Sequence, residues 1–202
     1  MRLTALVSLS LVALATAVPY GITSSTEAKS VLAQLKVSPG GSTYGYSLAQ
    51  FGSVQMRTDK CDTEEIVRWR DASANAQVDD KCSLVMGTWT SPWDGVTWPS
   101  SQADKISVER LITPLNAWIS GASAWTAEKR QLFLNDLERP ELWAVTKTLG
   151  TTRGDKTPEA WKPPLSTARC NYAVAWVDVK GYWGLSVTQA EKTALLSMLN
   201  VC

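Results

Sequence analysis

Histidine is absent from this chain of 202 residues. Its absence excludes a Ser-His-Asp or Cys-His catalytic centre, histidine metal ligands and an imidazole general base. The chain also lacks an excess of one charge, with 20 basic and 19 acidic side chains, and it lacks an apolar run long enough to span a membrane. Since 45% of the residues are hydrophobic, we exclude a disordered or fibrous protein and expect one folded domain, or two small ones.

Residues 1–17 have the pattern of a secretory signal peptide. Arg2 gives a positive start, residues 6–14 are apolar, and Ala15-Thr16-Ala17 has the small residues of a cleavage site. The alternative is a buried N-terminal helix. Cleavage after Ala17 removes one basic residue and no acidic one, so the mature chain is neutral. The sequence therefore predicts a secreted, extracellular protein with no membrane partner.

The four cysteines predict two disulfides, because an exported chain meets an oxidising environment. They are Cys61, Cys82, Cys170 and Cys202. Three pairings are open. We prefer Cys61 with Cys82 and Cys170 with Cys202, since each pair closes a moderate loop within one half of the chain. A zinc site is a poor alternative, because no second cysteine stands beside either member of the first pair.

Turn residues divide the mature chain into a helical start and a main domain. Residues 18–43 read as an N-terminal helix and a linker: Ser24 and Glu27 form a capping box, and Pro39 to Ser42 end the segment. Residues 44–202 read as a single domain. Its first part has short apolar runs between turns, which predicts a small antiparallel sheet. These runs are Ile66 to Trp69, Leu84 to Trp89 and Val96 to Trp98.

The rest of the domain has helical patterns, so the fold class is α+β. Thr126 and Thr188 are expected N-caps, the second with Glu191 in a capping box. Pro158 suits the first turn of another helix, which Pro163 and Pro164 would end. The expected helices cover about residues 116–124, 126–137, 157–162, 168–180 and 189–199.

Ten tryptophans are a heavy load for this length, and we assign most of them to the core. The expected core set is Trp69, Trp89, Trp118, Trp125, Trp143 and Trp176. Trp93 and Trp98 flank a turn and are the expected exposed pair, which would suit stacking on sugar rings. The acidic residues show no matched catalytic pair. Arg153, Lys156 and Lys162 form one small basic cluster, which is weak evidence for phosphate binding.

One long stretch is similar to a known family. It is carried by Asn116-Ala117-Trp118, Leu142-Trp143-Ala144-Val145-Thr146, Gly154-Asp155-Lys156, Trp161-Lys162-Pro163-Pro164 and Cys170-x-Tyr172-Ala173. The chain resembles secreted fungal and bacterial proteins with the HNH-like domain found at the C-terminus of GmrSD-type restriction endonucleases. The resemblance covers about residues 44–202. It implies a ββα-metal, or His-Me finger, centre within the α+β fold.

The resemblance implies two site segments. In the family, one strand carries an Asp-x-Asp-His motif, and an asparagine follows later in the chain. The histidine would activate water, and a divalent metal would stabilise the phosphate charge. Here Glu109 and Arg110 stand over the last Asp-His, and a one-residue shift places Leu111 over the histidine instead. Gly150 lies in the segment that replaces the asparagine-rich turn. Arginine stays protonated and cannot act as the base.

Four polar residues of the family pattern remain and could shape a groove: Asn135, Asp136, Asp155 and Lys156. Helix capping and surface pairing are the alternative roles for them. We therefore expect a nuclease-like scaffold without catalytic or metal-binding residues, acting by binding as a fungal effector towards a host protein or nucleic acid. The alternative is a residual metal-dependent endonuclease that uses Glu109, Asp136 or Asp155. We expect a monomer, and a divalent metal as cofactor only under that alternative.

Overall fold

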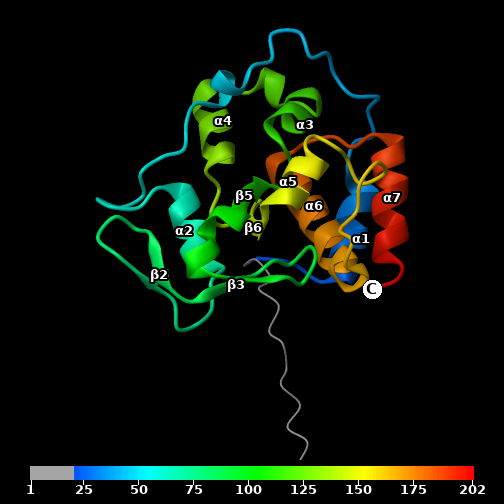
Figure 1. The fold of residues 1–202 in the computed structure, drawn as a ribbon. Coiled ribbons are helices and arrows are strands. Elements are labelled where there is room, and N and C mark those ends of the chain that lie inside the picture. The colour runs from blue at the N-terminus through cyan, green and yellow to red at the C-terminus, as the bar shows by residue number, and fades with distance from the viewer. Residues whose placement is uncertain (1–20) are drawn as a thin grey trace, which may run out of the picture.

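The computed structural model describes residues 21–202, so the expected signal peptide lies outside the described part. The fold is α+β (Figure 1). The α-helices are α1 (Ser25–Gln34), α2 (Thr63–Arg70), α3 (Pro114–Ile119), α4 (Ala127–Leu134), α5 (Lys147–Arg153), α6 (Arg169–Trp183) and α7 (Gln189–Leu199). Short 3-10 helices cover Leu48–Phe51, Ser100–Lys105, Ala122–Ala124 and Ser166–Ala168. No helix among the described residues is long and apolar enough to cross a membrane.

The strands form three separate antiparallel pairs rather than one small sheet. The strands are β1 (Gln77–Val78), β2 (Leu84–Met86), β3 (Thr88–Thr90), β4 (Thr97–Pro99), β5 (Ile106–Arg110) and β6 (Leu142–Thr146). They pair as β1–β2, β3–β4 and β5–β6. Two of these pairs lie in the region where the sequence predicts a sheet. The third joins segments far apart in the sequence, with Ile106 opposite Thr146 and Arg110 opposite Leu142.

Three helices form one side of the molecule, where α1 and α7 pack against α6 and against each other (Figure 1). The expected capping boxes are present at Ser24 and at Thr188, so both helices begin where the sequence predicts. Helix α1 buries Ala28 and Leu32 against this core. Helix α6 is buried along most of its length, which is typical of a helix at the centre of a core.

Two predicted elements are wrong. Ile66 to Trp69 belong to helix α2, because Asp62 and Glu65 form a capping box just before them. That box outweighs the β-propensity of Ile66, Val67 and Trp69. The expected helix at Thr157 is only a turn, in which the amides of Ala160 and Trp161 both donate to the carbonyl of Thr157.

The tryptophan assignments need three corrections. Trp93, expected to be exposed, is fully buried, and its ring lies 5.0 Å from that of Trp161, between centroids. Trp98 is half-buried, and its indole Nε1 donates to Thr146 Oγ1 at 3.0 Å. Trp69, expected in the core, is 49% exposed. The remaining members of the expected core set are buried, apart from the half-buried Trp125.

The preferred disulfide pairing is confirmed. Cys61 pairs with Cys82 and Cys170 with Cys202, with Cα–Cα distances of 5.3 and 5.4 Å. The first bridge ties the residues just before α2 to the loop between β1 and β2. The second ties the first turn of α6 to the end of the chain after α7. Each bridge restricts the unfolded chain and so favours the folded state.

Candidate functional site

The β5–β6 pair and helix α5 carry Glu109 and Gly150, two of the positions that the resemblance assigns to the site. Helix α5 follows directly on β6 and packs against both β5 and β6 (Figure 1). Ile106 and Val108 of β5 face the cluster that contains Val67 of α2. Because side chains alternate along a strand, Ser107 and Glu109 face the opposite side. The sequence analysis predicts no helix over residues 147–153, so α5 is an element that it missed.

Glu109 lies directly against Gly150 of α5. The Ser107 hydroxyl donates a hydrogen bond of 2.7 Å to Glu109 Oε1. A Cβ atom at position 150 would lie 2.9 Å from Cγ of Glu109 and closer still to its carboxylate. Real Cβ contacts are not this short, so Glu109 occupies the space that any side chain at position 150 would need.

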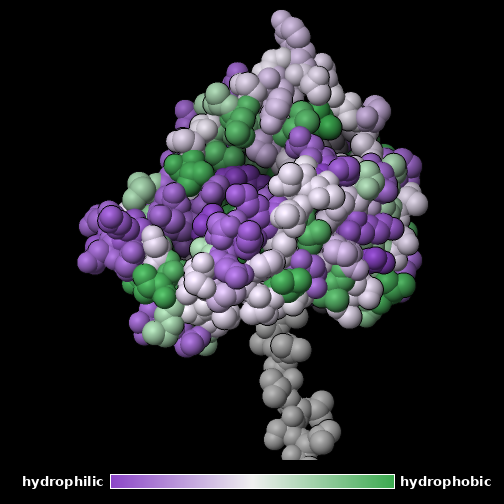
Figure 2. Space-filling view, in the orientation of Figure 1, coloured by the Kyte–Doolittle hydropathy of each residue, from purple (hydrophilic) through white to green (hydrophobic). Residues whose placement is uncertain are grey.

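Arg110 points away from this contact, toward α2 and the end of α4. Its Nε donates to the carbonyl of Leu134 at 3.1 Å, and its Nη1 lies 3.2 Å from Glu64 Oε1 of α2. Figure 2 shows hydrophilic residues gathered over α2 and the β5–β6 pair on this side of the molecule. Leu111, the alternative position for the histidine, is fully buried in the core.

Asn135 and Asp136 are buried and tied into the fold. Asn135 accepts hydrogen bonds from the amide of Gln55 and the hydroxyl of Thr63, and its amide group donates to two carbonyls. The carboxylate of Asp136 accepts from the amides of residues 138 and 139 and from the indole of Trp183. These contacts join the end of α4 to the rest of the core.

Asp155 and Lys156 are exposed, and the Lys156 ammonium donates to the carbonyl of Thr152 at 2.5 Å. Within residues 21–202, no three cysteine or acidic side chains are placed so that they could share a metal ion. The predicted site residues therefore do not form one cluster in the structure. Glu109 and Gly150 are in contact, whereas Asp136 and Asp155 do not join Glu109 in a cluster of metal-ligating groups.

Arg153 is a residue whose role the sequence analysis missed. It is fully buried, and its guanidinium donates to the carbonyls of Arg110 and Leu111, at the end of β5. It also lies 5.4 Å from the ring centroid of Trp93. The sequence groups Arg153 with Lys156 and Lys162 in a small basic cluster, but the structure buries Arg153 and leaves the two lysines exposed. Its position at the end of a helix, among buried rings, makes it a structural link between α5 and β5.

Glu141 is a second buried ionisable residue, next to β6. The amide of Ile112 donates to its Oε2 at 3.1 Å, and its Oε1 has no hydrogen-bond partner among the described residues. Burial raises the pKa of Glu141 well above the usual value, although the hydrogen bond from the Ile112 amide and the charges of Arg110 and Arg153 oppose this shift. The folded state therefore favours the protonated, neutral acid.

We expect Glu141→Gln to stabilise the protein at pH 7 by about 1–3 kcal/mol, because glutamine is neutral and removes the free-energy cost of protonating a buried acid above its usual pKa. In the unfolded chain Glu141 ionises near its usual pKa, and in the folded protein only at higher pH. The contribution of Glu141 to the free energy of unfolding is therefore present below pH 4.5 or so and is lost as the pH rises from about 4.5 through the raised pKa. Urea unfolding at several pH values measures this slope. The slope should shrink in Glu141→Gln and stay unchanged in the exposed control Glu159→Gln; an unchanged slope in Glu141→Gln would contradict the assignment.

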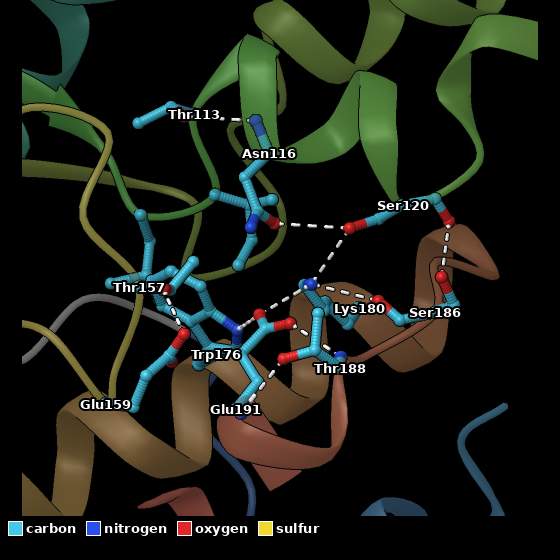
Figure 3. Close-up of polar contacts among 12 residues, drawn as sticks. Thr113, Asn116, Ser120, Thr157, Glu159, Trp176, Lys180, Ser186, Thr188 and Glu191 are labelled. Atoms are coloured by element: carbon cyan, nitrogen blue, oxygen red, sulfur yellow. Dashed lines mark hydrogen bonds and ion pairs between the residues drawn. The ribbon is translucent and has the colours of Figure 1, made fainter. Parts of the chain in front are cut away.

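A buried ion pair joins α6 to α7 (Figure 3). Lys180 Nζ lies 2.7 Å from Glu191 Oε1, and the two side chains are 0% and 1% exposed. The ammonium also donates to Ser120 Oγ and to the carbonyl of Ser186, at 3.1 and 2.9 Å. Glu191 accepts in addition from the indole of Trp176 at 2.9 Å. The sequence signalled only the Thr188–Glu191 capping box, not this pairing.

The Ser120 hydroxyl beside Lys180 resembles a nucleophile next to an amine base. Burial lowers the pKa of Lys180, but the carboxylate of Glu191 opposes that shift. A base must be free of its proton, whereas this ammonium uses all three N–H groups on Glu191, Ser120 and Ser186. We therefore assign the pair a structural role.

A relative supports the secreted assignment. The chain is 44% identical, over 184 residues, to an uncharacterized secreted protein of Arthroderma benhamiae; the match covers 91% of this chain and 89% of the relative. The chain belongs to the same family of secreted proteins. No family model and no solved structure matches it. With its two disulfides, this protein is secreted and extracellular.

Proposed function

We propose that this secreted protein keeps the scaffold of the HNH-like nucleases, has lost metal-dependent phosphodiester cleavage, and acts by binding a host macromolecule. The observation that carries the proposal is the contact between Glu109 and Gly150. The resemblance assigns these two positions, which are far apart in the sequence, to one site. Their packing across β5 and α5 supports the proposal, because the resemblance implies that the histidine of the strand and the later asparagine lie in one site.

The residues present do not fit the divalent metal of that family. Glu109 offers one carboxylate, and Gly150 has no side chain that could be a second ligand. Arg110, at the histidine position, is held in an ion pair with Glu64 and cannot take a proton from water. Catalysis through this centre therefore lacks both its base and its metal ligands.

A host protein is the favoured partner. The mature chain is neutral, so only weak and salt-sensitive binding of nucleic acid is expected. The proposed role as an effector rests on analogy, because the chain resembles secreted fungal proteins. The second candidate function is a residual endonuclease that uses Glu109, Asp136 or Asp155. The hydrogen bonds that already engage Asp136 and the separation of these carboxylates count against it.

The test is incubation of the mature, disulfide-bonded protein with DNA and RNA, each with Mg²⁺, Mn²⁺ or Zn²⁺. A relative that retains the Asp-x-Asp-His motif is the positive control, and Arg110→His is run beside the wild type. We expect no cleavage above the buffer control from the wild type while the relative cleaves. Metal-dependent cleavage that Glu109→Gln abolishes would overturn the proposal in favour of the endonuclease.

A further inference from the structure

The chain between α1 and the 3-10 helix Leu48–Phe51 forms a loop that stands out from the surface at the top of the view (Figure 1 and Figure 2). All residues from 41 to 45 are exposed. Tyr44 is 91% exposed, the largest value among the exposed large hydrophobic side chains of the described residues. The loop therefore presents nearly the whole of an aromatic side chain to solvent.

The turn around Tyr44 is closed by its own hydrogen bonds. The amide of Tyr44 donates to Ser42 Oγ, and the amide of Tyr46 donates to the carbonyl of Thr43, both at 3.0 Å. Across the described part of the chain, no hydrogen bond ties residues 42–45 to another segment. Opening this turn therefore breaks only local hydrogen bonds, which is typical of the loops where endoproteases cut a folded protein.

Both flanks of the loop are anchored to the core. The amide of Gly41 donates to the carbonyl of Ile119 at 2.6 Å, and the ring of Tyr46 lies 6.0 Å from that of Trp118, between centroids. Phe51, shortly after the loop, is fully buried. Local opening is therefore confined to the turn between these anchors, and the rest of the fold stays intact while the turn opens.

We propose that this loop is a proteolytic cleavage site, at which an extracellular endoprotease that prefers aromatic residues hydrolyses the Tyr44–Gly45 bond of the folded protein. Such a protease holds the aromatic side chain in a hydrophobic pocket, and Gly45 leaves the other side of the bond free of a side chain. Water adds across the amide, so that Tyr44 gains a carboxylate and Gly45 an amine. The site is independent of the proposed nuclease-like centre, which lies in β5, β6 and α5.

Other exposed aromatic side chains are poorer targets because they lie on helices. Trp69 belongs to α2 and Tyr182 to α6, and they are 49% and 59% exposed. An endoprotease binds its substrate as an extended chain, so cleavage there first requires the helix to unwind and lose its backbone hydrogen bonds. The turn at Tyr44 opens without this loss.

Cleavage at this bond leaves α1 attached by non-covalent contacts. All four cysteines lie after residue 44, so no disulfide joins the N-terminal fragment to the rest of the chain. Ala28 and Leu32 of α1 are buried in the core that α6 and α7 share. Before the helix, the amide and the hydroxyl of Thr23 both donate to the carboxylate of Asp178, at 2.9 and 2.7 Å.

Backbone pairing holds the other end of α1. The amide of Ser38 donates to the carbonyl of Val187 at 2.9 Å, and the amide of Val187 donates to the carbonyl of Lys36 at 3.0 Å. Lys192 of α7 also donates to the carbonyl of Ala33 at 3.1 Å. The N-terminal fragment therefore stays in place after cleavage, as a non-covalent part of the same fold.

The test is brief digestion of the mature, disulfide-bonded protein with a small amount of chymotrypsin, followed by intact mass measurement and N-terminal sequencing. We expect one early cut, with a new N-terminus at Gly45. Tyr44→Ala should slow this cut by about tenfold or more, because the hydrophobic pocket of the protease loses its ring. Tyr182→Ala is the matched control: it removes an exposed tyrosine from a helix and should be cut at the wild-type rate.

Retention of the fragment is measured on the cleaved protein by native mass spectrometry over a dilution series. We expect one species with the mass of the intact protein plus one water, which separates into two fragments in urea without a reductant. Leu32→Ala should weaken retention by about tenfold or more, because it removes a buried side chain from α1. Gln34→Ala, at an exposed position of the same helix, should retain the fragment as the wild type does.

The proposal is overturned if the folded protein resists chymotrypsin or is cut first at another bond. It is also overturned if Tyr44→Ala is cut at the same bond as fast as the wild type, or if the fragment ending at Tyr44 leaves the cleaved protein before urea is added. None of these results depends on cleavage of DNA or RNA, so the two proposals fail separately.

Discussion

Replacing Lys180 with methionine is expected to lower the free energy of unfolding by about 3–5 kcal/mol, the cost of leaving one charge of a buried pair alone. The variant leaves the carboxylate of Glu191 buried with only the Trp176 indole and the amide of Thr188 as donors. It also removes the donor that joins Ser120 and Ser186 to α6. Urea unfolding followed by circular dichroism measures the loss.

Glu191→Gln should be destabilising for the same reason, since it leaves the Lys180 ammonium without its counter-charge. The double variant Lys180→Met/Glu191→Gln should lose less than the sum of the two single variants, because it buries no unpaired charge. Lys147→Met, at an exposed lysine on α5, controls for loss of positive charge and should change stability by less than about 0.5 kcal/mol. Additive losses in the double variant would show that the pair does not act as a unit.

Gly150→Ala is expected to destabilise the wild-type protein by about 1–3 kcal/mol, because the new methyl group displaces Glu109 from a packed position. In a Glu109→Ala background the same substitution should stabilise the protein by about 0.5–1 kcal/mol, since alanine is a better helix former than glycine. The sign of the effect therefore depends on residue 109. A double-mutant cycle in urea measures this coupling directly.

Thr148→Ala is the control for this cycle. Thr148 is exposed on the same helix, so its substitution should have the same effect in the wild type and in the Glu109→Ala background. If Gly150→Ala is equally destabilising in both backgrounds, Glu109 is not the group that excludes a side chain at position 150. The contact on which the proposed nuclease-like centre rests would then be absent in solution.

The sequence predicted correctly the features that depend on residues close to one another in the chain. The capping boxes at Ser24 and Thr188 place the starts of α1 and α7 correctly, because a cap is a contact between residues three positions apart. An equal signal at Asp62 was available and was missed in favour of the β-propensity of the following residues. The preferred disulfide pairing was also correct, since each pair closes a moderate loop within one half of the chain.

Only the tertiary structure could place Trp69 and Trp93. Trp93 follows a proline in a turn, a setting typical of the surface, yet Trp161 and Tyr172 from distant segments cover it. Trp69 lies in an apolar run, yet α2 turns its side chain into an open groove. Burial of a large ring depends on what packs over it, and that partner is not encoded next to it in the sequence.

The sequence by itself determined that histidine chemistry is impossible, that the chain is exported and disulfide-bonded, and where several helices begin. These properties follow from composition and from contacts over a few residues. Only the tertiary structure brought Glu109 against Gly150 and Lys180 against Glu191, because strand pairing and helix packing join segments that are distant in the chain. The candidate site depends on such long-range contacts.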